Sequence, residues 1–357
     1  MRAQLLTLMI HLLFLGILLT TLTWFTLDDQ YVEHYRLQPK MKSVPRSVKS
    51  CKSCGENIKQ ALELYSQAWQ KQEDTYQNFS FQLSSKCNGF QKAIITQTNT
   101  PLGSTIVYDG ERKRTLTVKE EMFNNFPKEN PFSNKKWHTC AVVGNGGILA
   151  NSSCGNAIDS AQFVIRCNLP PLSNGYEKDV GVKTNIVTAN PTIFLQKYGA
   201  LTGRRLPLMK KLRDYGNSLL FLPSFSFGMN TAVCLRVLYT IEDFGGPVQP
   251  VFFNPDYLHN VSLFWRSQGL RAARLSTGIT MVSLALELCE NVHLYGFWPF
   301  DVHPYDFKDI TNHYYDNQKV TSFHAMPAEF KLLLQLHSKG VLKMNLGDCK
   351  PDENSFH

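Results

Sequence analysis

The sequence predicts an α/β fold built on a mostly parallel sheet, with helices on both faces. Short apolar runs of strand length alternate with longer segments that have apolar residues at helical spacing. Such alternation is typical of parallel sheets, in which a helix returns the chain to the starting edge before each new strand. A glycine-rich turn at Gly144, Gly146 and Gly147 directly follows the first of these runs. Turns of this kind let the backbone approach a ligand closely.

The predicted elements follow one another through the second half of the chain. The predicted strands are residues 140–143, 163–166, 185–188, 219–222, 251–253, 292–295 and 341–344. The predicted helices are residues 208–215, 231–242, 257–268, 277–289 and 327–338.

Several polar and aromatic side chains follow the ends of these strands. They include Asn145 in the glycine turn, Asn168, Asn190 and Trp298. Ligands in open parallel sheets bind beyond the carboxyl ends of the strands. We therefore expect these residues to share one cleft, although asparagine is also a common turn residue.

The N-terminal part of the chain has a different character. Residues 5–27 are almost wholly apolar, with His11 the main interruption. A helical span needs about 20 such residues, which predicts a membrane anchor preceded by a short cytoplasmic tail at residues 1–4. Residues 28–90 are rich in Gln, Lys, Glu and Ser and predict a stem, and residues 91–357 are the predicted catalytic domain.

Charge alone does not orient the predicted anchor, because more basic residues follow it than precede it. Sequons at Asn78, Asn151 and Asn260, together with nine cysteines, favour an oxidising and glycosylating compartment for the main part of the chain.

The odd number of cysteines leaves at least one unpaired within a monomer. Cys167 and Cys234 lie in apolar surroundings and are predicted to be buried thiols. The Cys51–Cys54 pair lacks the strand and helix pattern of a redox motif. We expect it to form a bridge to Cys87 or an intermolecular bond. No second close Cys/His pair has the spacing of a zinc site.

The net charge of +8 comes from dispersed Lys and Arg residues, without the basic and aromatic clusters of nucleic-acid-binding proteins. The sequence therefore predicts no nucleic-acid partner. A basic balance suits anionic small-molecule or glycan substrates.

Four segments of this chain resemble the motifs of a known enzyme family. Residues 140–191 resemble the long sialylmotif, and residues 275–300 resemble the short one. The sequences HYYDN at 313–317 and HAMPAE at 324–329 resemble the third and very short motifs. In this order, and with the terms GNGGIL, RCNLPP and GFWPF, the chain resembles the α2,8-sialyltransferase family.

The resemblance implies a modified glycosyltransferase A-type fold and a type II Golgi membrane enzyme whose donor is CMP-sialic acid. It also implies disulfides Cys140–Cys289 and Cys154–Cys349. No cofactor or metal is expected, because the chain has no Asp-x-Asp motif and the donor carries a single phosphate that hydrogen bonds can stabilise.

The resemblance also assigns roles to individual residues. His324 is the expected general base, since the pKa of histidine suits proton transfer near neutral pH. His313 is expected to contact the donor phosphate, and Trp298 to line the donor site. Further donor-binding residues are expected among the turn asparagines and at a helix N-terminus, which suits an anion: Asn145, Asn168, Asn190, Ser276, Thr277 and Gly278.

The sequence thus predicts transfer of sialic acid in α2,8-linkage to a terminal sialic acid on a ganglioside or glycoprotein glycan, with inversion. One alternative is an α2,3- or α2,6-sialyltransferase acting on galactose or GalNAc. Another is a catalytically inactive sialoglycan-binding protein. Residues 253–274 hold three arginines and no lysine, which predicts short products rather than a polymer. The acceptor class stays open, and a homodimer is a further partner to consider.

Overall fold

The computed structural model describes residues 4, 9–23, 52–132, 136–318 and 324–349. The chain divides into two compact units, Met1–Lys52 and Ser53–His357. In the first unit, residues 9–23 are helical. Among the described residues, no helix combines the length and apolarity that a membrane span requires. Residues 1–3, 5–8 and 24–51, which include parts of the predicted tail, anchor and stem, lie outside the described residues.

A seven-stranded sheet organises the second unit, with strand order β7-β6-β5-β4-β3-β8-β9. Every pairing between neighbours in this sheet is parallel. This arrangement confirms the predicted α/β fold. The strands are β3 (Trp137–Val143), β4 (Phe163–Arg166), β5 (Ile186–Thr188), β6 (Leu219–Leu222), β7 (Gln249–Phe252), β8 (Cys289–Tyr295) and β9 (Lys343–Asn345).

The order of the strands places a topological switch point between β3 and β8. From β3 the chain adds β4, β5, β6 and β7 in one direction, and then returns to place β8 on the other side of β3. Connections from these two strands leave the sheet in opposite directions, and this opens a crevice beyond their carboxyl ends. The glycine turn after β3 and the Gly296–Trp298 segment after β8 lie at this edge.

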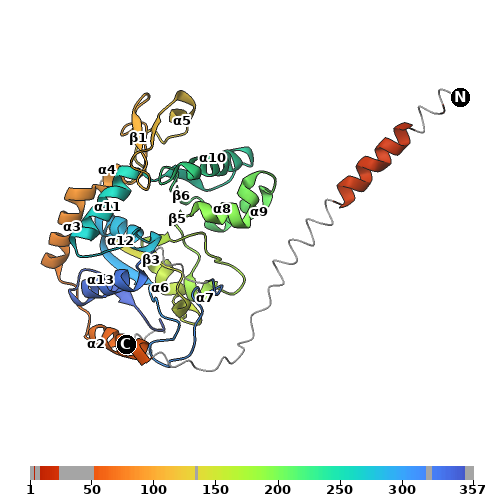
Figure 1. The fold of residues 1–357 in the computed structure, drawn as a ribbon. Coiled ribbons are helices and arrows are strands. Elements are labelled where there is room, and N and C mark those ends of the chain that lie inside the picture. The colour runs from red at the N-terminus through yellow and green to blue at the C-terminus, as the bar shows by residue number, and fades with distance from the viewer. Residues whose placement is uncertain (1–3, 5–8, 24–51, 133–135, 319–323, 350–357) are drawn as a thin grey trace. The chain divides into compact units, whose positions relative to one another are not determined.

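Helices cover both faces of the sheet (Figure 1). One face packs with α2 (Lys52–Tyr65), α3 (Glu73–Cys87), α4 (Gly89–Lys92), α11 (Pro255–Ser267), α12 (Thr277–Leu288) and α13 (Met326–Ser338). The other face packs with α6 (Gly155–Ser160), α7 (Glu177–Val180), α8 (Pro191–Lys197), α9 (Leu206–Leu212) and α10 (Gly228–Asp243). Alternate strand residues, such as Val142 and Val143, enter opposite cores.

Helix α12 is the most buried of these helices, with every residue from Ile279 to Leu288 buried. It lies between β3 and β8 on one side and α3 on the other. From α3, Tyr76 donates a hydrogen bond to the carbonyl of Cys289, and Ser80 Oγ donates to the carbonyl of Leu286 at 2.8 Å. A helix that is apolar all round is expected in such a position.

These contacts change the boundary predicted for the stem. Helix α3 lies within residues 28–90, yet its Tyr76, Leu83 and Cys87 are fully buried. The compact unit begins at Ser53 rather than near residue 91. The partly apolar helical pattern at Ile58 and Leu62 therefore marks a core-packed helix, with Ile58 buried.

Most predicted elements are present with shifted ends. Strands at 163–166 and 219–222 have the predicted bounds, whereas β8 begins three residues earlier than the predicted 292 because it continues directly from α12. The sequence did not predict the antiparallel hairpin of β1 (Thr105–Val107) and β2 (Thr115–Thr117), helix α5 (Glu120–Asn124) or helix α8. These elements are too short for a clear apolar period.

Both disulfides implied by the resemblance are present. Cys140 is bonded to Cys289 and Cys154 to Cys349, with Cα–Cα distances of 6.0 and 4.6 Å. Cys167 and Cys234 are buried free thiols, as predicted.

Cys87 is also a buried free thiol, so the expected bridge between Cys87 and the Cys51–Cys54 pair is wrong. The Cys87 side chain faces the interior beside α12, where it packs as a small apolar group. Cys51 lies outside the described residues.

The sequons differ in accessibility. Asn78 on α3 and Asn151, which follows the turn after β3, are exposed, whereas Asn260 on α11 is half-buried. Asn78 Oδ1 accepts a hydrogen bond from Gln82 at 3.0 Å.

Candidate functional site

Two glycine segments meet at the switch point. Gly144 N–H donates to the carbonyl of Tyr295 at 2.8 Å, and Gly146 N–H donates to the carbonyl of Gly296 at 3.0 Å. A Cβ atom on Gly146 would lie 2.6 Å from the Gly296 oxygen, a separation that real side chains do not reach. Gly296 itself has a φ of +73°, which favours glycine. Glycine at these positions therefore allows the two strand ends to close against each other.

The predicted asparagines lie at this edge and differ in their hydrogen bonds and backbone conformation. Asn145 Nδ2 donates to the carbonyl of Cys167 at 2.9 Å, while Asn145 Oδ1 is buried without a hydrogen-bond partner. Asn168 has a φ of +63° and its N–H donates to Thr188 Oγ1 at 3.0 Å. The Asn145 amide therefore ties the ends of β3 and β4 together. Asn168 adopts the left-handed conformation that asparagine tolerates.

The N-terminus of α12 carries the predicted Ser276, Thr277 and Gly278. Ser276 caps the helix, since its Oγ accepts from the N–H of Ile279 at 3.2 Å. Thr277 Oγ1 lies 3.5 Å from Asn190 Oδ1, which brings the end of β5 to this helix. The first turn of α12 and Asn190 therefore belong to the same edge of the sheet as the glycine turn.

Glu329 accepts hydrogen bonds from both polar groups of Ser276. The Ser276 N–H donates to Glu329 Oε1 at 2.8 Å, and the Ser276 hydroxyl donates to Glu329 Oε2. Burial raises the pKa of the Glu329 carboxyl, against these opposing hydrogen bonds. The Ser276 side chain is thus engaged within the protein, and Thr277 and Gly278 are the members of this turn with half-exposed positions.

His324 lies beside the same helix terminus. Its Nδ1 is 3.2 Å from the carbonyl oxygen of Arg274. A carbonyl oxygen can only accept, so Nδ1 carries the proton in this hydrogen bond. In the neutral imidazole the lone pair then resides on Nε2, which is the form of histidine that can remove a proton.

His313 is held in a second polar arrangement. Its Nδ1 is 2.7 Å from Asp316 Oδ1, and its ring stacks on Tyr315 with centroids 5.2 Å apart. Burial would raise the pKa of Asp316, but the hydrogen bonds from His313 and Gln318 bring that pKa below its ordinary value. An ionised Asp316 accepts a hydrogen bond from Nδ1 and so orients the imidazole.

Backbone contacts attach this loop to the glycine turn. Gly146 and His313 form an isolated antiparallel bridge, and Tyr314 N–H donates to the carbonyl of Asn145 at 2.9 Å. A Cβ on Gly147 would overlap the carbonyl of Thr311. The third motif therefore lies directly against the long motif.

Aromatic residues after β8 complete the cluster. A Cβ atom on Gly278 would lie 3.0 Å from the Phe297 ring, so the first turn of α12 packs against this ring. Trp298 is buried, donates from Nε1 to the carbonyl of Val302 at 2.8 Å, and packs edge-to-face on Phe330 of α13. Trp298 therefore packs between the segment after β8 and α13. Its indole N–H donates to a carbonyl of the protein itself.

The predicted site residues thus form one contiguous set at the carboxyl edge of the sheet. The contacts run from His313 through Gly146 to Gly296, and from Phe297 through Gly278 to Ser276. Ser276 continues the set to Glu329, beside His324. Segments far apart in the chain therefore lie together at one edge of the sheet.

Comparison with known proteins identifies the family. A sequence profile of glycosyltransferase family 29 (sialyltransferase) matches residues 94–341, more than half of the chain. The chain belongs to this family. Human alpha-2,8-sialyltransferase 8F is 42% identical over 288 residues, covering 81% of this chain and 72% of the relative. Alpha-N-acetylneuraminide alpha-2,8-sialyltransferase of Xenopus tropicalis is 44% identical over 300 residues, covering 84% and 86%. A solved mammalian sialyltransferase aligns with a TM-score of 0.41 and 23% identity, over 59% of this chain and 70% of that chain.

Within this family 29 sialyltransferase, sequence reasoning assigned roles to the histidines but not to the groups that hold them. Asp316 lies three residues after His313, and this spacing within the motif could have indicated that the two side chains pair. The contact of His324 with the Arg274 carbonyl could not be predicted, because a backbone oxygen has no signature in the sequence.

Proposed function

We propose that this family 29 enzyme transfers sialic acid from CMP-sialic acid in α2,8-linkage to a terminal sialic acid of a glycan. The human and Xenopus tropicalis relatives are both named as α2,8-sialyltransferases, which supports the α2,8-linkage. The name of the frog enzyme also gives α-N-acetylneuraminide as the group it acts on. The arrangement of His324 at the start of α12 is the observation that carries the mechanism.

In the proposed mechanism, His324 Nε2 removes the proton from the acceptor hydroxyl as that oxygen attacks the anomeric carbon of the donor. The Arg274 carbonyl favours this tautomer by accepting from Nδ1. The bond from the anomeric carbon to the CMP phosphate breaks in the same displacement. One direct attack without an enzyme nucleophile inverts the anomeric configuration.

His313 is proposed to stabilise the departing CMP phosphate. Asp316 Oδ1 accepts from Nδ1 at 2.7 Å, so a ring that also carries a proton on Nε2 could donate to the phosphate. A cation near the leaving group offsets the negative charge that develops there. The half-exposed turn at Thr277 and Gly278 offers further backbone N–H groups to the donor.

We propose that transfer does not require a metal ion, since the chain contains no Asp-x-Asp motif and the histidine and N–H groups can stabilise a single phosphate. The short-product expectation from residues 253–274 is part of the same proposal. The acceptor is a ganglioside or a glycoprotein glycan.

We also propose that residues 5–27 anchor the enzyme in the Golgi membrane, with the Ser53–His357 unit in the lumen. The two disulfides support an oxidising compartment, where such bonds form and persist.

A transfer assay on the full-length chain tests this function. CMP-sialic acid would be supplied in EDTA together with either a sialylated ganglioside or a sialylated O-glycoprotein, and linkage analysis would identify the product. His324→Ala is expected to lower kcat by about 10²-fold or more. His337→Ala, a histidine packed on Tyr65, is the control for the loss of an imidazole elsewhere.

Three outcomes would contradict the proposal in different parts. Product linked to galactose or GalNAc would indicate an α2,3- or α2,6-enzyme. Binding of sialoglycans without release of CMP would favour an inactive binding protein. Loss of transfer in EDTA that is restored by a divalent ion would contradict the metal-independent mechanism.

A further inference from the structure

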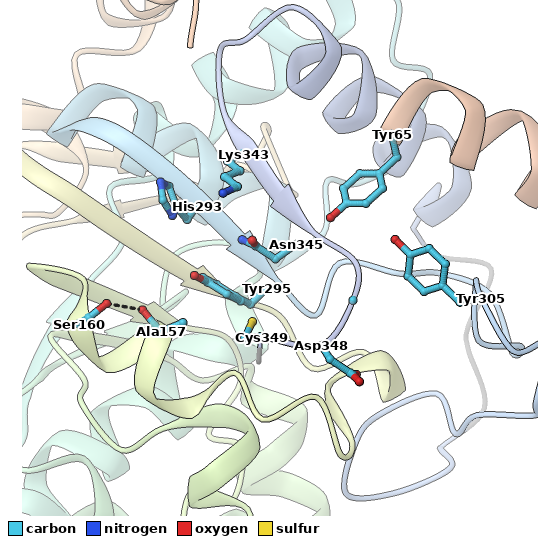
Figure 2. A pocket seen from close by; sticks show the side chains of 11 residues that line it. Tyr65, Ala157, Ser160, His293, Tyr295, Tyr305, Lys343, Asn345, Asp348 and Cys349 are labelled. Atoms are coloured by element: carbon cyan, nitrogen blue, oxygen red, sulfur yellow. Dashed lines mark hydrogen bonds between the residues drawn. The ribbon is translucent and has the colours of Figure 1, made fainter. Parts of the chain in front are cut away.

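A groove lies on the β8–β9 part of the sheet, and none of the residues predicted to bind the donor or to act in catalysis lines it. A cavity of about 580 Å³ has a floor made of two cross-strand pairs, His293 beside Lys343 and Tyr295 beside Asn345 (Figure 2). A second cavity of about 380 Å³ shares Tyr65, Tyr305 and Lys343 with the first. We call the two together the edge groove.

The walls of the edge groove are aromatic and held in place. Tyr65 Oη accepts from the N–H of Leu346 at 3.2 Å, and Trp69 Nε1 donates to the carbonyl of Leu342 at 3.0 Å. The Tyr65 ring stacks on His337 with centroids 5.1 Å apart. Rings that are fixed before binding lose little conformational freedom when a ligand packs on them.

The groove carries one cation on its floor. Among the described residues, Lys343 forms no ion pair, and its ammonium lies 5.7 Å from the Trp69 ring centroid. Asp348, the acidic residue of the lining, lies at the other end of the cavity in Figure 2. Burial and the nearby Lys343 lower the pKa of His293 to about 4, so His293 is neutral. Among the described residues that line the floor, Lys343 is therefore the cation.

Amide and hydroxyl groups complete the lining. Asn345 Nδ2 donates to the carbonyl of Leu294 at 3.1 Å, which fixes the amide on the floor. Tyr305 is 52% exposed and lies across from Tyr65 in Figure 2. The groove thus offers flat aromatic faces, a few oriented polar groups and one positive charge in a volume typical of small-ligand sites.

We propose that the edge groove is a second glycan-binding site, which takes a terminal sugar bearing a carboxylate, as sialic acid does. The aromatic side chains would pack on the apolar face of the sugar ring, and Lys343 would pair with the carboxylate. Asn345 and the tyrosine hydroxyls would bind the sugar hydroxyls. A glycan held here would be retained by the enzyme without occupying the transfer site.

Saturation-transfer NMR on the full-length chain tests this site. CMP would first be added to fill the nucleotide part of the transfer site, and the methyl α-glycoside of N-acetylneuraminic acid would then be added as the probe. We expect the probe to bind in the presence of CMP, and its methyl ester, which lacks the charge, to bind at least tenfold more weakly.

Variants then locate the bound probe. Lys343→Met is expected to weaken binding at least tenfold, whereas Lys343→Arg keeps the charge and most of the affinity. Tyr305→Ala should also weaken binding, and this partly exposed position tolerates truncation without loss of the fold. Lys339→Met is the matched control, because Lys339 is exposed and lies outside the groove.

Two results would overturn the proposal. One is no binding of the probe to the CMP-saturated wild type. The other is equal binding by wild type and Lys343→Met. The readout needs no catalysis, so a failure of the proposed transferase activity would leave this test intact.

Discussion

At the scale of single residues, the site depends on groups that hold the two histidines. His313 is fixed by a carboxylate at 2.7 Å, and His324 by a carbonyl at 3.2 Å. These partners differ in charge, since one is a carboxylate and the other a neutral carbonyl. Each accepts a hydrogen bond from Nδ1, so each ring is held in a defined orientation. The proposed roles of the two histidines therefore depend on different neighbours.

Replacing Asp316 with Asn tests the support of His313 at the residue scale. The substitution removes the carboxylate that accepts from His313 Nδ1 and so holds the ring less firmly, and we expect kcat to fall about 10- to 100-fold with a smaller change in KM. Steady-state kinetics would measure both parameters.

Asp306→Asn is the control for this substitution. Asp306 lies in the same loop but pairs with Lys308 at the surface. An unchanged kcat for Asp316→Asn, or an equal loss in the control, would show that Asp316 does not support His313 in transfer.

At the scale of elements, α12 connects the site to the N-terminal helices through a buried carboxylate. Glu287 is fully buried on α12. Its Oε2 accepts from the N–H of Gly89 at 2.6 Å, and its Oε1 accepts from Tyr257 Oη at 3.2 Å. Burial raises the pKa of Glu287 to about 7, against these two hydrogen bonds. The contact between α12 and α4 thus involves a group that titrates near neutral pH.

This contact predicts a pH-dependent stability. The folded pKa is about 7 and the ordinary value 4.5, so between these values the folded state holds the proton more tightly. The stabilisation is complete below pH 4.5 and is lost as pH rises through 7, by on the order of 3 kcal/mol. Glu287→Gln should raise the Tm above pH 7 and flatten its dependence on pH.

Thermal unfolding between pH 5 and 8 would measure this effect. Glu290→Gln, an exposed neighbour on β8, should leave the slope unchanged. If the slope of the Glu287 variant matches that of wild type, another group is responsible for it.

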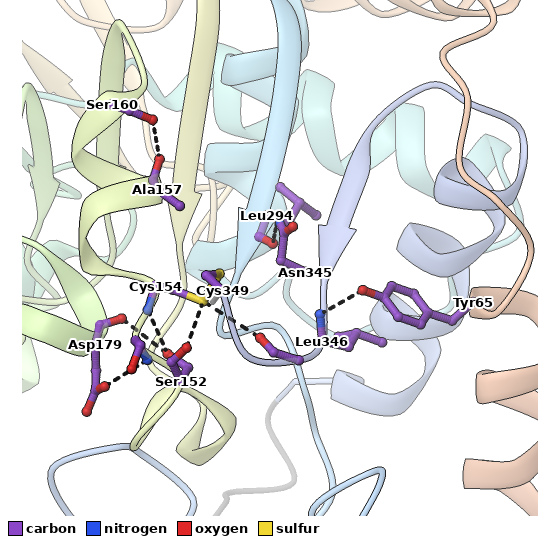
Figure 3. The surroundings of a disulfide bond; sticks show 12 residues. Tyr65, Ser152, Cys154, Ala157, Ser160, Asp179, Leu294, Asn345, Leu346 and Cys349 are labelled. Carbon is purple, nitrogen blue, oxygen red and sulfur yellow. Dashed lines mark hydrogen bonds between the residues drawn. A yellow bond between two sulfur atoms is a disulfide. The ribbon is translucent and has the colours of Figure 1, made fainter. Parts of the chain in front are cut away.

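At the scale of the whole molecule, two disulfides join distant parts of the chain. Cys140–Cys289 connects the two strands that flank the switch point. Cys154–Cys349 joins the segment after β3 to the segment after β9 (Figure 3). There Cys349 N–H also donates to the carbonyl of Ser152 at 2.8 Å. Both bonds therefore hold elements that end at the functional edge of the sheet.

Removing Cys154–Cys349 in the double variant Cys154→Ala and Cys349→Ala should destabilise the protein. The bond spans a sequence separation of 195, and the chain-entropy description assigns loops of this size on the order of 5 kcal/mol. Denaturant unfolding would measure the change. Cys234→Ala, at a buried free thiol, controls for lost packing and should cost about 1 kcal/mol. Equal losses in the two variants would contradict a role for the cross-link.

The sequence by itself determined the alternation of strands and helices, the glycine turn and, through the resemblance, both disulfide pairs. These features depend on local patterns of apolar residues or on motifs that lie within short segments. The bounds of β4 and β6 were correct for the same reason, since each is a short apolar run between turns.

Only the tertiary structure decided the long-range partners. It placed α3 and α4 in the core, left Cys87 unpaired, paired Ser276 with Glu329 and brought the Arg274 carbonyl to His324. Ser276 and Glu329 are 53 positions apart, so no local period links them. Such contacts depend on how the sheet orders its strands and on which helix faces become buried. Those are properties of the whole packed chain rather than of any one segment.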